Sequence, residues 1–178
     1  MKRAVIGVMG SGVETWEDYV KPLAQWIADN DFHLLTGGGG GVMAVASASF
    51  SEAPNRKGGL CIGVVPTNLA DNGLYVVKDG YPNRWVDLTI VSPLPSFSGK
   101  DPDEISRNHI NILSSDVLIA LPGSKGTRNE VDLSARFQKP IILYGPVASF
   151  AEFPAALPRT DSLAEVTHFI LAHAGNRA

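Results

Sequence analysis

The sequence is short of cysteine, of long apolar runs and of positive charge, and each shortage excludes a class of protein. Cys61 is the one cysteine among 178 residues, so the chain forms no internal disulfide and no cysteine metal cluster. No uncharged stretch approaches the ~20 apolar residues of a membrane helix. The net charge of −3 argues against nucleic-acid binding through a broad basic surface. With no signal-peptide pattern after Met1, we expect a cytoplasmic protein without membrane or nucleic-acid partners.

Histidine is also scarce, and the four that are present do not suggest a metal site. His168 and His173 are five residues apart, off the same-face spacing of a helix, and no acidic cluster accompanies them. We therefore expect no bound metal. Ser11 lacks the surroundings of a nucleophilic serine, which excludes acyl transfer. Cys61 lies in an apolar run and is expected to be a buried core residue.

Length and composition are those of an ordinary globular protein. Hydrophobic residues make up 44% and charged residues 19% of the chain, far from the composition of disordered proteins. A chain of this length can bury a sizeable core. No linker or internal repeat is evident, and residues 1–178 are expected to form one nucleotide-binding domain.

Apolar runs and helical patterns alternate along the chain. Pro66 is expected to end the third strand, 67–83 to be a loop, and 92–101 to be a long binding loop or lid. Such alternation predicts an α/β fold: a Rossmann-like, doubly wound, largely parallel sheet with helices on both faces. The expected strands are 4–8, 32–35, 60–65, 86–91, 117–121 and 140–144, and the expected helices are 15–29, 42–50, 101–115, 127–137, a short one near 149, and 162–174.

Two glycine-rich turns stand out, Gly37–Gly41 and Pro122–Thr127. Each follows an apolar strand and precedes a helix, so each brings backbone N–H groups to a helix N-terminus, which favours anions. The run Gly37–Gly41 matches neither the phosphate-binding P-loop nor the dinucleotide fingerprint. Gly10–Gly12 follows the first strand and offers further N–H groups. Since ligands bind at the carboxyl ends of parallel strands, we expect the turns to hold one phosphate from two sides.

Two charged residues have competing interpretations. Glu130 ends a Thr-x-x-Glu sequence that fits a helix capping box, in which it would be structural. Arg107 lies in the first turns of the expected helix 101–115, where an arginine is commonly a solvated surface residue. An arginine near a helix N-terminus is electrostatically unfavourable, however, and this favours a nearby anion.

With these motifs in order, the chain resembles the Lonely Guy (LOG) or "lysine decarboxylase-like" superfamily, which includes cytokinin-activating phosphoribohydrolases and molybdenum cofactor carrier proteins. The superfamily's Pro-Gly-Gly-x-Gly-Thr-x-x-Glu motif corresponds to Pro122–Glu130, and its Gly-Gly-Gly-x-x-Gly-Leu-Met-Gly motif to the segment through Met43 and Ala44. Arg107 also keeps the family's spacing of nine residues before Asp116. The resemblance spans roughly residues 4–145.

The resemblance implies a site for a small phosphorylated ligand. Arg107 and Glu130 match the catalytic pair of the phosphoribohydrolases. By this resemblance Glu130 would stabilise the cationic character that develops at the ribose as the N-glycosidic bond breaks, or orient the attacking water, and Arg107 would bind the phosphate or the leaving group. Members are commonly homodimers, and apolar positions at 46–50 and Leu113 are candidates for that surface. The ligand-binding candidates are Gly10, Ser11, Gly37, Gly38, Gly39, Gly40, Gly41, Met43, Pro122, Gly123, Ser124, Lys125, Gly126 and Thr127.

Three hypotheses follow for the function. The first is hydrolysis of a nucleoside 5′-monophosphate to base and ribose 5-phosphate, with no required cofactor. The second is a non-catalytic carrier of molybdenum cofactor, a phosphorylated pterin, which the Gly-Gly-Val-Met sequence and the departures at Ala44, Asn108 and Ser124 favour. The third is a nucleotide sensor without either activity.

Overall fold

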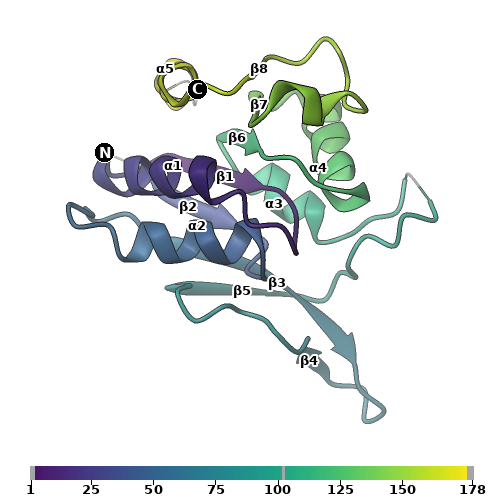
Figure 1. Cartoon of the computed structure of the whole chain (residues 1–178). Helices are drawn as coiled ribbons and strands as arrows, with labels where there is room; N and C mark the ends of the chain where they lie inside the picture. Colours follow the sequence, from purple (N-terminus) through teal and green to yellow (C-terminus); the bar gives the residue numbers. More distant parts are fainter. Residues whose placement is uncertain (1–2, 102, 176–178) are drawn as a thin grey trace.

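The structure is a computed structural model that describes residues 3–101 and 103–175 (Figure 1). Strands and helices alternate along most of the chain, as the sequence pattern predicts. The strands are β1 (Val5–Met9), β2 (His33–Thr36), β3 (Cys61–Leu69), β4 (Tyr75–Val77), β5 (Leu88–Ser92), β6 (Val117–Ala120), β7 (Ile141–Tyr144) and β8 (Arg159–Thr160). The helices are α1 (Glu17–Asp29), α2 (Val42–Ser51), α3 (Asn108–Ser114), α4 (Lys125–Arg136), the 3₁₀-helix η1 (Val147–Phe150) and α5 (Leu163–His173).

The sheet is largely parallel and doubly wound, which confirms the predicted fold class. From β1 the chain builds β2, β3 and β5 in one direction, then returns to place β6, β7 and β8 on the other side of β1. Among the described strands, only β4 pairs antiparallel, with the end of β3. The winding direction therefore reverses between β1 and β6, the position at which sheets of this kind bind ligands.

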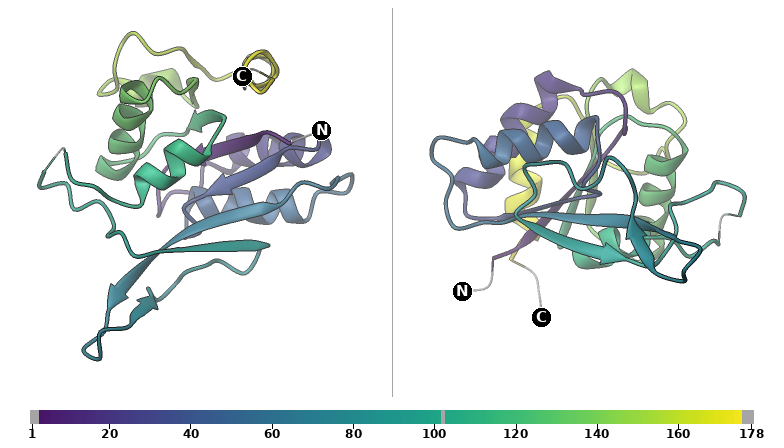
Figure 2. Two further views of the ribbon diagram at one scale, coloured as in Figure 1. Left: turned by 180° about the vertical axis from the view of Figure 1, so that it is seen from behind. Right: turned by 90° about the horizontal axis from the view of Figure 1, so that it is seen from below.

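Helices cover both faces of the sheet (Figure 2). On one face α1, α2 and α5 pack on alternate strand residues such as Ile6 and Val8, and Cys61 is buried there, as predicted. Its burial raises the pKa of the thiol to about 11. On the other face α3 and α4 cover the residues between, such as Leu118 and Ala120. Because successive side chains of a strand point to opposite faces of the sheet, the same strands contribute to the core on both faces.

The expected end of β3 at Pro66 is wrong, and so is the expected loop 67–83. β3 continues to Leu69, because its pairing with β2 ends at Gly63 and no β2 neighbour requires an N–H from the proline. β3 then turns into β4 through Asn72-Gly73, with Gly73 at φ 79°. An Asn-Gly pair is a common hairpin turn, so the signal was present in the sequence. β8 was also missed, since it has two residues.

The helix expected over 101–115 is shorter, because α3 begins only at Asn108. Asp101 accepts a hydrogen bond from the backbone of Asp103, and Glu104 turns back to bind Ser98. These local side-chain contacts compete with helix formation. Pro102, expected in the first turn of this helix, lies outside the described residues.

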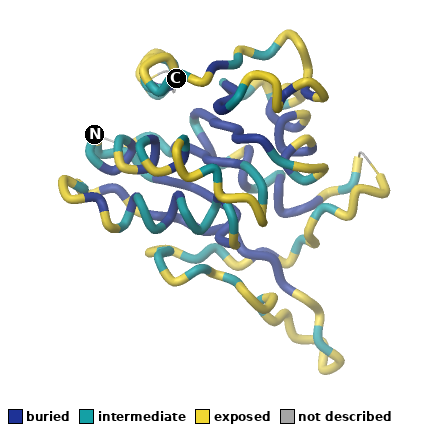
Figure 3. The backbone as a smooth tube through the Cα atoms, in the orientation of Figure 1, coloured by how far each residue is buried: buried dark blue, intermediate teal, exposed yellow. Residues whose placement is uncertain are grey.

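The expected apolar surface at 46–50 is also wrong. Ala46 and Phe50 are completely buried against the sheet, whereas Leu113 on α3 is 49% exposed. The ribbon formed by the end of β3 and β4 is largely exposed and extends away from the body (Figure 3). Within 3–101 and 103–175, no helix is long and apolar enough to cross a membrane.

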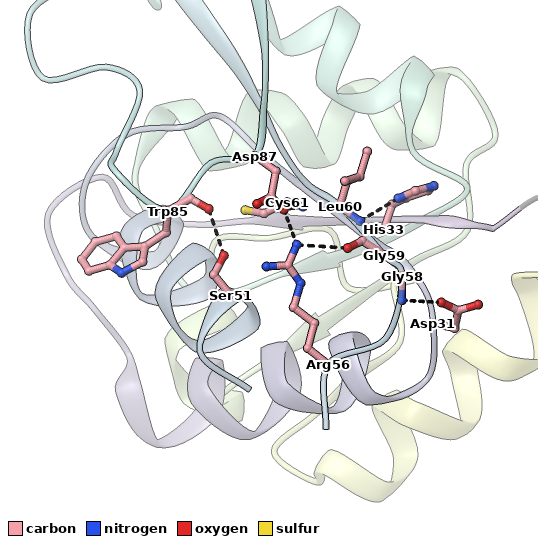
Figure 4. A network of polar contacts seen from close by, with 10 residues as sticks. All are labelled: Asp31, His33, Ser51, Arg56, Gly58, Gly59, Leu60, Cys61, Trp85 and Asp87. Atoms are coloured by element: carbon pink, nitrogen blue, oxygen red, sulfur yellow. Dashed lines mark hydrogen bonds and ion pairs between the residues drawn. The ribbon is translucent and has the colours of Figure 1, made fainter. Parts of the chain in front are cut away.

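A polar network fixes the amino-terminal ends of β2, β3 and β5 (Figure 4). Arg56 forms an ion pair with Asp87 and donates a hydrogen bond to the carbonyl of Gly59. His33 Nδ1 accepts a hydrogen bond from the backbone N–H of Leu60 at 2.9 Å. Because parallel strands share a direction, this network lies at the opposite end of the sheet from the carboxyl-end cavity described next.

Candidate functional site

A cavity of about 180 Å³ lies at the carboxyl ends of β1, β2 and β6. The turn after each strand contributes to it, together with the start of α3 and the first turns of α4. The cavity therefore sits at the reversal point of the sheet. Its lining residues are Val8, Met9, Gly10, Ser11, Gly12, Gly37, Met43, Tyr81, Arg107, Asn108, Ser124, Gly126, Thr127 and Glu130.

Both glycine-rich turns reach this cavity, as the sequence predicted. The predicted residues that line it are Gly10, Ser11, Gly37, Met43, Ser124, Gly126, Thr127, Arg107 and Glu130. The predicted residues outside its lining are Gly38, Gly39, Gly40, Gly41, Pro122, Gly123 and Lys125. Lys125 instead donates a hydrogen bond to the carbonyl of Ser98, on the 92–101 loop. The structure thus brings together about half of the predicted set.

The first glycine turn is filled by the protein's own side chains. A Cβ atom at Gly37 would lie 2.7 Å from Arg107 Nη1 and 2.8 Å from Met43 Sδ. One at Gly39 would lie 2.7 Å from the ring of Tyr81. Gly41 has φ 58°, and its Cβ would collide with the carbonyl of Ser11. These glycines allow neighbouring groups to approach the turn closely, which is a structural reason for the run beside any role in ligand binding.

The first turn also uses part of its own hydrogen-bonding capacity. The backbone N–H of Val42, at the start of α2, donates to the carbonyl of Ser11 at 2.9 Å. The N–H of Gly38 donates to Thr36 Oγ1 at 3.0 Å. Fewer donors are therefore left for an anion here than the run of five glycines suggests.

The second turn leaves its donors open. α4 begins at Lys125 with Ser124 as its N-cap residue, and within the described residues no side chain caps its N-terminal amides. The first N–H groups of a helix have no partner inside the helix. A Cβ at Gly126 would meet no atom within 4 Å, so the space beside this residue is open. The N-terminus of α4 is thus the part of the cavity best suited to an anion.

Glu130 lies one turn further along α4, where it is buried and lines the cavity. The capping-box interpretation is wrong, because Thr127 is inside the helix and Glu130 accepts a hydrogen bond from Asn111 of α3 at 3.2 Å. Burial raises the pKa of the Glu130 carboxyl to about 7, although Arg107 and Asn111 both favour its ionised form. Such a carboxyl exchanges a proton near neutral pH, as a general acid or base must.

Arg107 is buried, with 8% of its surface exposed, so its interpretation as a solvated surface residue is wrong. Its Nη1 donates to the carbonyls of Gly37 at 2.7 Å and Val64 at 2.6 Å. The guanidinium lies over the ring of Tyr81, with Cζ 5.3 Å from the ring centroid. Nε is buried without a hydrogen-bond partner among the described residues. Arg107 thus joins the ends of β2 and β3 and lends its positive charge to the cavity wall.

Sequence reasoning missed four lining residues: Val8, Met9, Tyr81 and Asn108. Val8 and Met9 end β1, directly before the predicted Gly10. Gly12 lines the cavity together with Gly10 and Ser11, as the expected turn Gly10–Gly12 indicated. Asn108 follows Arg107, and its side-chain amide donates to Asn129 at 2.9 Å. Tyr81 could not be found from spacing, because it comes from the irregular segment between β4 and β5.

Metal-binding side chains are not gathered in this cavity. Within the described residues, no group of three or more His, Cys, Asp or Glu side chains could hold a metal ion. The arrangement instead offers backbone N–H groups, the Thr127 hydroxyl and one arginine, which are suited to a phosphorylated organic molecule.

Comparisons with known proteins find similarity over nearly the whole chain. The molybdenum cofactor binding protein of Rippkaea orientalis is 31% identical, with a TM-score of 0.74 over 97% of this chain and 98% of its own. The molybdenum cofactor carrier protein of Chlamydomonas reinhardtii is 29% identical, with a TM-score of 0.66 over 96% and 99%. An uncharacterized protein of Archaeoglobus fulgidus is 29% identical over 82% of this chain and 87% of its own.

The resemblance to the LOG superfamily with its molybdenum cofactor carriers is thereby confirmed. A family model matches residues 3–170, which include every strand, the cavity and both glycine turns. The chain belongs to the SLOG cluster4 family.

Proposed function

We propose that the protein binds molybdenum cofactor in the cavity at the carboxyl ends of β1, β2 and β6, and carries it as cargo. The observation that supports this most is the uncapped N-terminus of α4, which opens onto the cavity beside the buried charge of Arg107. The phosphate of the pterin would bind the N–H groups of Gly126 and Thr127. Full-length similarity to two proteins described as binding or carrying this cofactor supports the choice of cargo.

The test is to identify what the protein retains when it is purified without oxygen from a molybdenum-replete host. We expect molybdenum by mass spectrometry and, after oxidation, a fluorescent pterin in comparable amount. The matched variant is Thr127→Val, which keeps the shape of the side chain and removes its hydroxyl from the cavity wall. Pterin absent from the wild-type protein, or nucleotides in its place, would contradict the proposal.

A second candidate is hydrolysis of a nucleoside 5′-monophosphate, which the position and pKa of Glu130 favour. A helix rises ~1.5 Å per residue, so Glu130 lies ~4.5 Å along α4 from Thr127. A ribose whose 5′-phosphate binds the helix N-terminus would therefore lie close to the carboxylate. Chromatography of AMP, GMP and CMP incubated with the protein would show base release. No release from any of them rules this activity out for these substrates.

We also propose that the chain forms a homodimer through the face of α3 that carries Leu113. This side chain is 49% exposed on the described surface, so it is accessible to a second copy of the chain. Light scattering coupled to size exclusion should give twice the monomer mass, and Leu113→Glu should halve it. A wild-type monomer would contradict this assignment.

A further inference from the structure

The cavity has two walls of different chemistry. One wall is polar and comes from the first turns of α4, with Ser124, Thr127 and Glu130. The other comes from Met43 at the start of α2 and from Tyr81, on the segment between β4 and β5. A phosphate is suited to the first wall, whereas a thioether and an aromatic ring favour contact with a flat apolar or aromatic group.

Tyr81 is held in a fixed position on its wall. The backbone N–H of Asn83 donates to the carbonyl of Gly38 at 2.8 Å, and the Asn83 side chain donates to the carbonyl of Gly39 at 3.0 Å. These two bonds attach the segment that carries Tyr81 to the first glycine turn. Arg107 lies over the ring as well. An aromatic side chain that is already ordered loses little conformational entropy when a ligand binds.

Met43 belongs to the same wall and packs against the first glycine turn. Its Sδ would lie 2.8 Å from a Cβ at Gly37, and its Cε 3.0 Å from one at Gly39. The thioether therefore occupies the space that the absent side chains of the turn leave free. The absence of side chains in the glycine run thus allows Met43 and Tyr81 to lie together at one edge of the cavity.

The volume of the cavity limits how much of a ligand it can hold. Its volume of about 180 Å³ is below the ~300–1,000 Å³ of pockets that enclose a drug-sized ligand. The cavity has room for part of a phosphorylated molecule, and the rest must lie along its rim. Tyr81 is only partly buried and lines the cavity, so part of its side chain is accessible to a ligand.

We propose that Tyr81 and Met43 form the subsite for the planar heteroaromatic ring of a ligand whose phosphate binds the N-terminus of α4. This inference rests on the proposed function in that it requires the phosphate to bind at α4. It adds the residues that recognise the other end of the molecule. Both ligands considered above, a pterin and a nucleotide, carry such a ring, whereas simple sugar phosphates do not.

The test compares GMP, whose guanine shares the 2-amino-4-oxopyrimidine ring of a pterin, with ribose 5-phosphate, which has no ring of this kind. Calorimetry should show tighter binding of GMP by the wild type. Tyr81→Ala should weaken GMP binding by about 5- to 150-fold, the range for loss of an aromatic side chain stacked on a base. It should leave the affinity for ribose 5-phosphate unchanged. Tyr81→Phe should bind GMP as the wild type does.

Two further measurements separate ring contact from a structural role. The matched control is Tyr75→Ala, since Tyr75 is 58% exposed on β4 and does not line the cavity. Nuclear magnetic resonance should show ring-current shifts of the Tyr81 ring protons with GMP and none with ribose 5-phosphate. The amount of pterin that copurifies should fall with Tyr81→Ala and stay unchanged with Tyr75→Ala.

The outcomes distinguish this inference from the proposed function. Equal affinity of the wild type for GMP and ribose 5-phosphate, or equal loss of both in Tyr81→Ala, would overturn the ring subsite and leave the phosphate site intact. Tight GMP binding that depends on Tyr81, without copurified pterin, would uphold the subsite and overturn the carrier. If the wild type binds neither probe and retains no pterin, both proposals fail.

Discussion

Replacing Glu130 with glutamine should stabilise the ligand-free protein at neutral pH and have little effect in acid. The folded state raises the pKa of this carboxyl from 4.5 to about 7 because it is buried. The folded protein therefore binds the proton more tightly than the unfolded chain does. The contribution of Glu130 to stability is therefore fully present below pH 4.5 and is lost as the pH rises from 4.5 to about 7. Glutamine keeps an oxygen for the hydrogen bond from Asn111 and has no proton to lose.

The size of the effect follows from the two pKa values. Their difference corresponds to roughly 3 kcal/mol, at ~1.4 kcal/mol per pKa unit. The free energy of unfolding of Glu130→Gln, minus that of the wild type, should thus increase by roughly 3 kcal/mol between pH 4 and pH 8. For a chain of this length that corresponds to a relative gain of roughly 6–12 °C in melting temperature.

The assay is urea unfolding of both proteins, followed by circular dichroism at five pH values from 4 to 8. Subtraction of the two curves removes the contribution of every other titrating group. Glu14→Gln, at an exposed position near the cavity, serves as the control for loss of a surface carboxylate. A difference that stays constant across this pH range would refute the reasoning, because the carboxyl would then ionise in the folded protein as it does in the unfolded chain.

Three further predictions concern single positions. Gly126→Ala should stabilise α4 by about 0.5–1 kcal/mol, because alanine favours a helix and its Cβ would meet no atom. The added methyl group at the cavity wall should weaken binding of ribose 5-phosphate, as measured by calorimetry. Gly41→Ala should destabilise the protein by about 2 kcal/mol or more in urea unfolding, because φ is 58° and the Cβ would collide with Ser11; a cost below about 0.5 kcal/mol contradicts this. Burial lowers the pKa of His33, so the contribution of this residue to stability is present above pH 6.5 and is lost as the pH falls below 6.5. His33→Gln should abolish that part of the loss of stability in acid, and an unchanged pH profile of the variant would contradict the prediction.

The fold, and the edge of the sheet at which the cavity lies, could be predicted from the sequence because both depend on the repeated alternation of strand and helix patterns. Short β-branched runs such as Ile141–Tyr144 recur between helical patterns, and this alternation admits few topologies. The glycine turns mark the carboxyl ends of β2 and β6, which parallel pairing brings to the same edge of the sheet. The position of the cavity follows from these two facts.

The details of the cavity were not predictable because they depend on contacts between distant segments. Arg107 is committed to the carbonyls of Gly37 and Val64, which lie 70 and 43 residues away in the sequence. Glu130 fits a local capping pattern, yet its partner is Asn111 on another helix. Tyr81 comes from a segment with no periodicity at all. Neither the spacing of residues along the chain nor the amino-acid composition indicates which distant residue a side chain will contact.

The central claim is that the cavity between the two glycine turns binds a phosphate at the N-terminus of α4. The most direct measurement is a ¹H–¹⁵N correlation titration of the labelled protein with ribose 5-phosphate. The structure predicts that the largest shifts occur at the amides of Gly126 and Thr127, with little change at Leu60 at the other end of the sheet. Shifts confined to residues outside the cavity, or none at millimolar ligand, would contradict the claim.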